Sequence, residues 1–340
     1  MQIHGGDVYR HPGVIDFSSN VYPEGTPEQI KKALKEAAEQ VFQYPDIVQE
    51  QLLKRLSEYE KRDSRQIVLG NGAAELIFAC VQALRPKKAM LVVPTFSEYE
   101  IALNSVNCEI VYYHLSDDFR LTNHILSSLT EDLDLVFLCN PNNPTGIPID
   151  SDLLQQIGDV CREKHIFIVI DECFQEFLET KHQFDFKSVM TEEDRVIIIK
   201  SFTKLFAIPG VRLGYLTASR FDICKRIRKL IQPWNLSVFA QVAGITALDI
   251  IEEQKEKILW IHEERSYVKM ELEKLGYRVW NSKANYLFFY SERPLYEKAL
   301  KAGFLIRDCS NYNGLQSGYY RIVIRRREEN ERLLEWLRQL

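Results

Sequence analysis

A lysine in an apolar stretch is the first residue that could do chemistry. Residues 201–215 read SFTKLFAIPGVRLGY, and Lys204 stands there among Phe, Leu, Ala and Ile side chains. An ammonium group in an apolar setting is costly unless it is paired or loses its proton. A lysine that loses its proton easily is the kind that forms Schiff bases with carbonyl compounds. The alternative is an ordinary surface lysine.

Groups that bind anions lie beside this lysine and in a second segment. Ser201 and Arg212 flank Lys204, and a hydroxyl and a guanidinium both bind phosphate oxygens well. Residues 70–75, GNGAAE, open a helical pattern, and their small side chains let backbone N–H groups approach an anion at the helix N-terminus. Taken alone, this segment is equally consistent with a tight turn.

Two further polar segments follow apolar runs. Residues 139–146, CNPNNPTG, contain two Asn-Pro pairs, which favour an extended turn. Asp171 follows the apolar run at residues 166–170, and its alternative role is to cap the next helix. Because ligands of parallel α/β sheets bind beyond the carboxyl ends of the strands, these segments predict one site that combines a phosphate cup, a carboxylate, an asparagine and an amine.

The elements that would position these groups alternate between helix and strand from about residue 26 to residue 220. Thr26 is expected to cap the first helix, with Pro27 at its first position. Helical patterns also cover residues 73–84 and 151–165. Short runs rich in Val, Ile and Leu predict strands at residues 66–69, 89–93, 109–113, 134–138, 166–170 and 195–199. Continuous apolar strands that alternate with helices predict a mainly parallel sheet covered on both faces.

The pattern changes after about residue 235, where we expect a domain boundary. Residues 247–275 form one long charged amphipathic segment. Short alternating strands follow it, and a helix at residues 329–340 ends the chain. This α+β character predicts a second, smaller domain.

Composition excludes several classes of protein. The 340-residue chain has a net charge of −5, which argues against a nucleic-acid partner. The basic run at residues 325–327 precedes two glutamates and is expected to begin a solvated helix. Seven scattered cysteines without C-x-x-C spacing suggest neither a disulfide framework nor a metal site. Since the sequence has no signal-peptide pattern and no apolar run long enough to cross a membrane, we expect a cytoplasmic protein with no membrane partner.

The combined motifs resemble a known superfamily. Ser201-x-x-Lys204 with Arg212, the segment NPTG at residues 143–146, and Asp171 resemble the fold-type I aminotransferases, which depend on pyridoxal 5′-phosphate. The resemblance runs from about residue 4 to about residue 337. It implies an α/β fold with a mainly parallel seven-stranded sheet flanked by helices. The implied domains are a large cofactor-binding domain at residues 26–235 and a small α+β domain formed by residues 1–25 and 236–340.

The resemblance also implies a role for each matching residue. Lys204 would carry the cofactor as a Schiff base, and Asp171 would pair with its ring nitrogen. Asn143 would hydrogen-bond the phenolic oxygen of the ring, and Phe96 would stack on the ring. The cofactor phosphate would be bound by Gly72, Ala73, Ala74, Ser201 and Arg212. Tyr44 would reach the phosphate of a partner subunit, which implies a homodimer.

Segments near both ends of the chain resemble the threonine-phosphate decarboxylases of cobalamin biosynthesis. They read HGG at residues 4–6, DFSSN at 16–20, QPW at 232–234, IRDCSNY at 306–312 and YYRI at 319–322. Phe174 also fits that group, because many aminotransferases place there a tyrosine that bonds the ring oxygen. By this resemblance, the anionic groups of a small phosphorylated amino acid are bound by His4, Asn20, Arg307 and Arg321.

Charge agrees with such a substrate. An O-phosphorylated amino acid carries a carboxylate and a phosphate, which two arginines complement. The alternative is that Arg307 and Arg321 are exposed surface residues. The resemblance implies decarboxylation of L-threonine O-3-phosphate to (R)-1-aminopropan-2-yl phosphate for the cobalamin nucleotide loop. The main rival is a histidinol-phosphate or related aminotransferase, and a ligand-sensing regulator with this fold is a further one.

Overall fold

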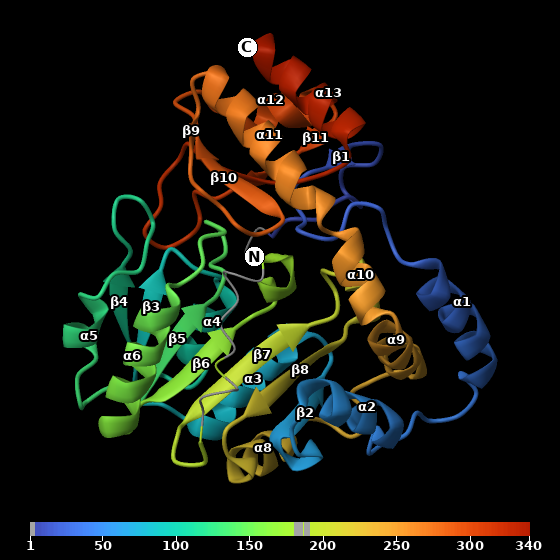
Figure 1. Ribbon diagram of the computed structural model, residues 1–340, viewed down its shortest axis with the longest axis vertical. Coiled ribbons are helices and arrows are strands. Elements are labelled where there is room, and N and C mark those ends of the chain that lie inside the picture. Colours follow the sequence, from blue (N-terminus) through green and yellow to red (C-terminus); the bar gives the residue numbers. More distant parts are fainter. Residues whose placement is uncertain (1–3, 180–185, 187–190) are drawn as a thin grey trace.

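The computed structural model describes residues 4–179, 186 and 191–340. A large sheet with helices on both sides occupies the lower part of Figure 1. The chain from α11 (Trp260–Lys274) onward forms a smaller unit above this sheet, and the N-terminal strand β1 (Ile15–Asp16) joins that unit (Figure 1). In the part of the chain that is described, no helix has both the length and the apolar character needed to cross a membrane.

The large sheet has seven strands in the order β2-β8-β7-β6-β5-β3-β4. Its strands are β2 (Ile67–Gly70), β3 (Lys88–Val93), β4 (Glu109–His114), β5 (Leu135–Cys139), β6 (Phe167–Asp171), β7 (Val196–Ser201) and β8 (Gly214–Ala218). The strand β8 runs antiparallel to both of its neighbours, β2 and β7, and the other pairs are parallel. The mainly parallel sheet is therefore confirmed, and the six expected strands lie within one or two residues of their predicted bounds. The pattern did not predict β8, because its sequence GYLTA is not a continuous apolar run.

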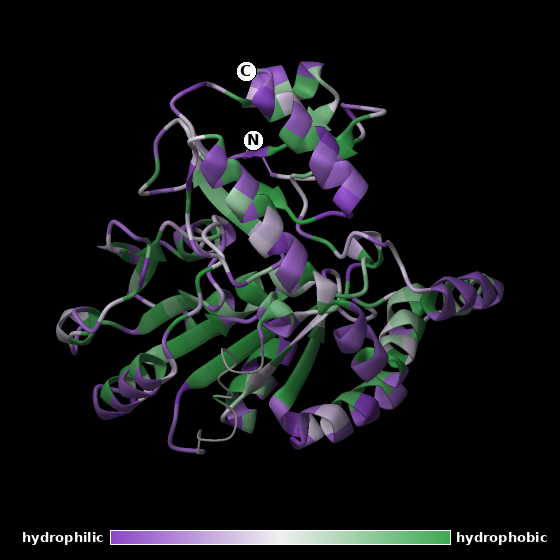
Figure 2. Ribbon diagram, turned by 45° about the horizontal axis from the view of Figure 1, so that its top comes forward, coloured by the Kyte–Doolittle hydropathy of each residue, from purple (hydrophilic) through white to green (hydrophobic). Residues whose placement is uncertain are grey.

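Successive strand residues face two separate hydrophobic cores, as the pleat requires. One core packs Phe137 and Val169 against α3 (Ala73–Leu84), α4 (Glu98–Asn104) and α8 (Phe221–Arg228). The other core packs the neighbouring residues Val136 and Ile168 against α5 (Ile125–Ser128) and α6 (Ser151–Glu163). Figure 2 shows the hydrophobic strands between helices whose outer faces are hydrophilic.

The smaller unit is built on an antiparallel sheet in the order β12-β13-β10-β9. A second pairing, between β1 and β11, is parallel and ties residues 15–16 to residues 304–305. The strands of this unit are β1 (Ile15–Asp16), β9 (Arg278–Val279), β10 (Tyr286–Tyr290), β11 (Phe304–Leu305), β12 (Arg307–Asp308) and β13 (Tyr319–Val323). Its helices include α11 (Trp260–Lys274), α12 (Tyr296–Lys301) and α13 (Arg327–Arg338). The domain division at residues 25/26 and 235/236 stays a prediction.

The charged amphipathic segment at residues 247–275 covers the end of α9 (Val238–Asp249), then α10 (Ile251–Lys257) and α11. One helix prediction needs correction. Thr26 does not cap the first helix. The helix α1 (Glu28–Ala37) starts one residue later than predicted, after Pro27, with no side-chain cap. Instead the Thr26 hydroxyl donates to the Ala207 carbonyl at 2.7 Å, which ties the chain before α1 to the segment that follows Lys204.

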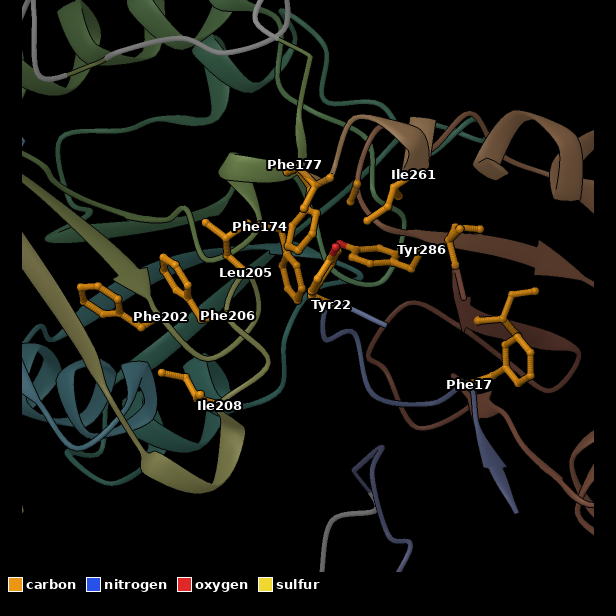
Figure 3. Close-up of a cluster of buried hydrophobic side chains, with 14 of the residues drawn as sticks. Phe17, Tyr22, Phe174, Phe177, Phe202, Leu205, Phe206, Ile208, Ile261 and Tyr286 are labelled. Atoms are coloured by element: carbon orange, nitrogen blue, oxygen red, sulfur yellow. The ribbon is translucent and has the colours of Figure 1, made fainter. Parts of the chain in front are cut away.

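A cluster of buried aromatic and aliphatic side chains fixes the segment around Lys204 (Figure 3). Phe202 and Phe206 stack at 6.0 Å on either side of Lys204 in the sequence. The cluster continues through Phe174, which meets Tyr286 of β10 edge-on at 5.1 Å. The lysine is thus held between the large sheet and the smaller unit, with little freedom to move.

Candidate active site

A cavity of about 480 Å³ opens where β5, β6 and β7 end. The last residues of these strands, Cys139, Asp171 and Ser201, all line it. Parallel pairing in register places Cys139 opposite Asp171, so the ends of neighbouring strands meet at one edge. The predicted site residues that line the cavity are His4, Asn20, Ala73, Ala74, Phe96, Asn143, Asp171, Ser201, Lys204, Arg212, Arg307 and Arg321. Gly72 and Tyr44 do not line it.

Two lysines four residues apart meet opposite environments. Lys200 is enclosed by carboxylates, with its Nζ 3.8 Å from Glu60, 3.8 Å from Glu172 and 3.6 Å from Glu176. Burial alone would lower the pKa of Lys200, but these carboxylates together raise it well above its ordinary value. Lys200 therefore stays an ammonium ion.

Among the residues that the structure describes, Lys204 has no comparable set of acids. Burial lowers the pKa of Lys204, and Arg321 and Arg212 lower it further, against the opposing influence of Cys173 and Asp171. Its Nζ lies 5.9 Å from the centre of the Phe174 ring and faces the cavity. Lys204 is thus the lysine of this pair that gives up its proton more easily and can act as a nucleophile.

The start of α3 and the end of β7 form an anion-binding corner. Gly72 precedes α3 with no side-chain cap, so the backbone N–H groups of Ala73 and Ala74 are available at the helix N-terminus. The Ser201 hydroxyl lies 2.7 Å from the Thr203 hydroxyl, and Arg212 borders the same corner. A hydroxyl pair, a guanidinium and a helix N-terminus together suit a phosphate group.

Gly72 leaves room for this corner. A Cβ atom at Gly72 would lie 2.3 Å from Arg212 Nη2, and the residue has φ +81°. Only glycine fits here, because any side chain would push the guanidinium away and strain the backbone.

Asp171 is held from two sides. Its Oδ1 accepts from the Cys173 backbone N–H at 2.9 Å, and its Oδ2 accepts from the Tyr99 hydroxyl at 2.7 Å. The next helical turn, η3 (Gln175–Phe177), starts after Phe174, so Asp171 does not cap it. Its carboxylate remains directed at the cavity, where a protonated ring nitrogen would complement it.

Asn143 lies in the turn that the two Asn-Pro pairs predicted. The adjacent Asn142 anchors this turn, because its Nδ2 donates to the Pro94 carbonyl at 3.0 Å and its carbonyl accepts from the Tyr286 hydroxyl at 2.8 Å. The Oδ1 of Asn143 accepts a hydrogen bond from Arg321 Nη1. The turn thus joins the large sheet to the smaller unit across the cavity.

Arg307 and Arg321 are buried, with exposed fractions of 4% and 5%, so the surface alternative is wrong. Arg321 Nη2 donates to the Ser18 carbonyl at 2.8 Å, and Arg307 Nη2 donates to Asn311 Oδ1 at 2.8 Å. These bonds fix both guanidinium groups at the edge of the cavity. Two buried cations on one cavity wall point to an anionic ligand.

Asn20 and His4 complete this wall. Asn20 is buried, and among the described residues neither of its side-chain amide atoms has a hydrogen-bond partner. Such an amide is costly unless a ligand or water satisfies it. The ring of His4 is half-exposed, and its Nε2 lies 3.2 Å from Glu98 Oε1.

The model of the class I and II aminotransferase family matches residues 12–337. The chain belongs to this family. It is 37% identical to the threonine-phosphate decarboxylase of Salmonella typhimurium over 99% of this chain and 96% of that protein. It is 30% identical to the histidinol-phosphate aminotransferase of Methanocaldococcus jannaschii over 96% of this chain and 89% of that protein. The crystal structure of the histidinol-phosphate aminotransferase from Clostridium acetobutylicum has a TM-score of 0.88 and 32% identity, covering 95% of this chain and 98% of that chain. The expected fold-type I architecture is thereby confirmed.

Tyr44 does not line the cavity of its own chain. It is 79% exposed, and its ring packs on Trp234 with 4.8 Å between centroids. Its role at a partner's site stays a prediction.

Several residues that line the cavity were not predicted from the sequence. They are Gly5, Ser18, Ser19, Glu98, Cys139, Cys173, Phe174, Thr203 and Tyr312, of which Phe174 had been noted only as a departure from the family pattern. Thr203 had a signal, since it lies between Ser201 and Lys204. Tyr312 had a weaker one, because it falls between the two predicted arginines. Nothing in the sequence pointed to Glu98, because a carboxylate is unexpected beside an anion-binding wall. Only the structure shows that Glu98 lies next to His4.

The Gly72→Ala variant is expected to bind pyridoxal phosphate at least about tenfold more weakly, because the methyl group displaces Arg212 and strains the backbone. Gly276→Ala is the matched control, since Gly276 has φ +85° but nothing within 4 Å of its would-be Cβ. Fluorescence titration of the apoproteins with pyridoxal phosphate measures both affinities. Equal affinities for the two variants would remove Gly72 from the phosphate corner.

Proposed function

We propose that this chain is a pyridoxal-phosphate-dependent decarboxylase of L-threonine O-3-phosphate that forms (R)-1-aminopropan-2-yl phosphate. The observation that carries the proposal is one cavity lined by Lys204 and Asp171, by two buried arginines, and by an asparagine whose amide atoms have no hydrogen-bond partner among the described residues. The likeness to the Salmonella threonine-phosphate decarboxylase over nearly the whole chain supports it. A likeness to the adenosylcobalamin biosynthesis bifunctional protein of Leptospira interrogans, 31% identical over 95% of this chain, supports a place in cobalamin biosynthesis.

The residues present fit pyridoxal phosphate. Lys204 would hold it covalently, Asp171 would face its ring nitrogen, and Phe96 would lie against its ring. Its phosphate would occupy the corner formed by Gly72, Ala73, Ala74, Ser201, Thr203 and Arg212. When bound, this cofactor supplies an electron sink for a carbanion at the α-carbon of an amino acid.

The chain's own groups would direct the reaction. Arg307 and Arg321 bind the two anionic groups of the substrate, with Asn20 and His4 beside them. By fixing both anions they would orient the α-carbon and so set which of its bonds breaks. When the carboxylate leaves as carbon dioxide, its bonding electrons stay at the α-carbon. Lys204, which would hold the cofactor covalently, would also be placed to return a proton to that carbon.

An aminotransferase acting on histidinol phosphate is the second candidate. The Clostridium acetobutylicum structure supports it, since the same cofactor chemistry serves both reactions. Phe174 favours decarboxylation, because it offers no hydroxyl to the cavity where many aminotransferases have one.

Product analysis separates the two candidates. The purified protein with pyridoxal phosphate is incubated with O-phospho-L-threonine, or with histidinol phosphate, each in the presence of 2-oxoglutarate. We expect carbon dioxide and aminopropanol phosphate from the first substrate, and no glutamate from either. Glutamate formation from histidinol phosphate would establish the aminotransferase instead.

We also propose a homodimer in which Tyr44 reaches the partner's cavity. Residues 41–48 and 230–234 carry a set of exposed large apolar side chains that a second copy would cover, namely Val41, Phe42, Tyr44, Ile47, Val48, Leu230 and Trp234. Sedimentation and a Tyr44→Ala variant test this arrangement.

The seven cysteines are all free thiols, as is usual in a reducing compartment, and we propose that the protein is cytoplasmic.

The Arg307→Met variant is expected to raise the KM for O-phosphothreonine by about tenfold to a hundredfold, because a charge-assisted hydrogen bond to an anionic group is lost. Steady-state assays of carbon dioxide release measure the change. Arg278→Met is the control, since Arg278 belongs to the same sheet but its side chain is 59% exposed. An unchanged KM in Arg307→Met would remove this arginine from the substrate site.

A further inference from the structure

Tyr99 of α4 is a fully buried tyrosine beside the cavity, at 0% exposure. Its ring stacks on Phe137 of β5 with 4.8 Å between centroids and 6° between planes. Phe96 meets it edge-on at 5.7 Å. These contacts on two sides leave the ring no room to turn away, so the position of its hydroxyl is fixed.

That hydroxyl is directed at Asp171. It donates to Asp171 Oδ2 at 2.7 Å, while the Cys173 backbone N–H occupies Oδ1 at 2.9 Å. Burial and the nearby Asp171 raise the pKa of Tyr99 well above its ordinary value, so the phenol keeps its proton and remains a donor. A buried carboxylate needs such donors, because losing water is costly for its charged form.

We propose that Tyr99 is the positioning residue of Asp171, holding its carboxylate aimed at the ring nitrogen of the bound cofactor. This inference rests on the proposed function. It assigns a role to the position three residues after Phe96. Phe96 lies just before α4 and would lie against the cofactor ring, while Tyr99 lies in the first turn of α4 and would support the carboxylate that faces the ring nitrogen.

Tyr215 offers a matched comparison within the same chain. It is also a buried tyrosine, and its hydroxyl donates to a buried carboxylate, Glu60. Burial likewise raises the pKa of Tyr215 well above its ordinary value. Tyr215 does not line the cavity, so it separates the cost of losing a buried phenol–carboxylate bond from any effect on the cofactor.

The test compares Tyr99→Phe with Tyr215→Phe after reconstitution with pyridoxal phosphate labelled with ¹⁵N in the ring. The ¹⁵N chemical shift reports whether the ring nitrogen is protonated, and thermal unfolding reports stability. We expect Tyr99→Phe to move the shift toward the unprotonated value and to weaken cofactor binding about tenfold or more. We expect Tyr215→Phe to lower stability while its ¹⁵N shift stays at the wild-type value.

A double-mutant cycle with Asp171→Asn shows whether Tyr99 acts through Asp171. If it does, Tyr99→Phe changes cofactor affinity little once Asp171 is already an amide. A Tyr99→Phe protein with the wild-type ¹⁵N shift and affinity, or full additivity with Asp171→Asn, would overturn the inference. Failure of the wild-type protein to bind pyridoxal phosphate would instead refute the proposed function, so the two failures are distinguishable.

Discussion

The Lys204→Ala variant is expected to release carbon dioxide from O-phosphothreonine roughly 10⁴-fold more slowly than the wild type, or slower still, because it loses both a covalent catalyst and a proton donor. Burial lowers the pKa of Lys204, so its amine loses its proton for covalent chemistry more easily than that of an ordinary lysine. Single-turnover assays measure the rate, and circular dichroism confirms that the variant is folded.

Lys200→Arg is the control for this experiment. Lys200 lies among three carboxylates, and arginine would keep a positive charge there. Lys200 does not line the cavity. We expect this variant to keep turnover close to that of the wild type, with any effect confined to stability. Normal turnover by Lys204→Ala would refute every enzymatic role proposed for the site.

The Asp171→Asn variant is expected to lower kcat by about 10²- to 10³-fold, the scale of losing one preorganised charge at a reacting group. An amide cannot stabilise a protonated ring nitrogen, so the electron sink weakens although the shape of the site is preserved. Asp194→Asn is the control, because Asp194 is also buried and hydrogen-bonded, to Arg162 Nε at 2.6 Å, but lies outside the cavity. If both variants lost activity equally, the effect would be one of folding rather than of catalysis.

Much of the fold could be predicted because buried parallel strands leave a clear signal. Strands such as β5 and β6 are covered on both faces, so they read as continuous Val, Ile and Leu runs. The strand β8 carries glycine and threonine, and it became a strand because two neighbours pair with it, which no local pattern reveals. Thr26 failed as a cap for a related reason, since the distant Ala207 carbonyl took its hydroxyl.

The residues of the site likewise divide into those that the sequence could reveal and those that it could not. Lys204, Ser201 and Arg212 lie close in sequence, so their types and spacing suggested a reactive amine beside phosphate-binding groups. Tyr99 could not be recognised, because its function depends on Asp171, 72 residues further along the chain. Nor could the sequence tell whether Arg307 and Arg321 were buried, since that depends on how the smaller unit packs on the large sheet. A motif can predict residues that lie close together in the sequence. Residues whose role depends on a contact with a distant part of the chain can be recognised only from the structure.

The central claim is that pyridoxal phosphate is bound covalently to Lys204. Borohydride reduction of the holoprotein followed by trypsin digestion and mass spectrometry tests it most directly. Trypsin cuts after Lys200 and Arg212, and a reduced link blocks the cut after Lys204, so we predict the cofactor on the peptide of residues 201–212. The cofactor on the peptide of residues 196–204, with Lys200 as the modified residue, or no modified peptide at all, would contradict the account.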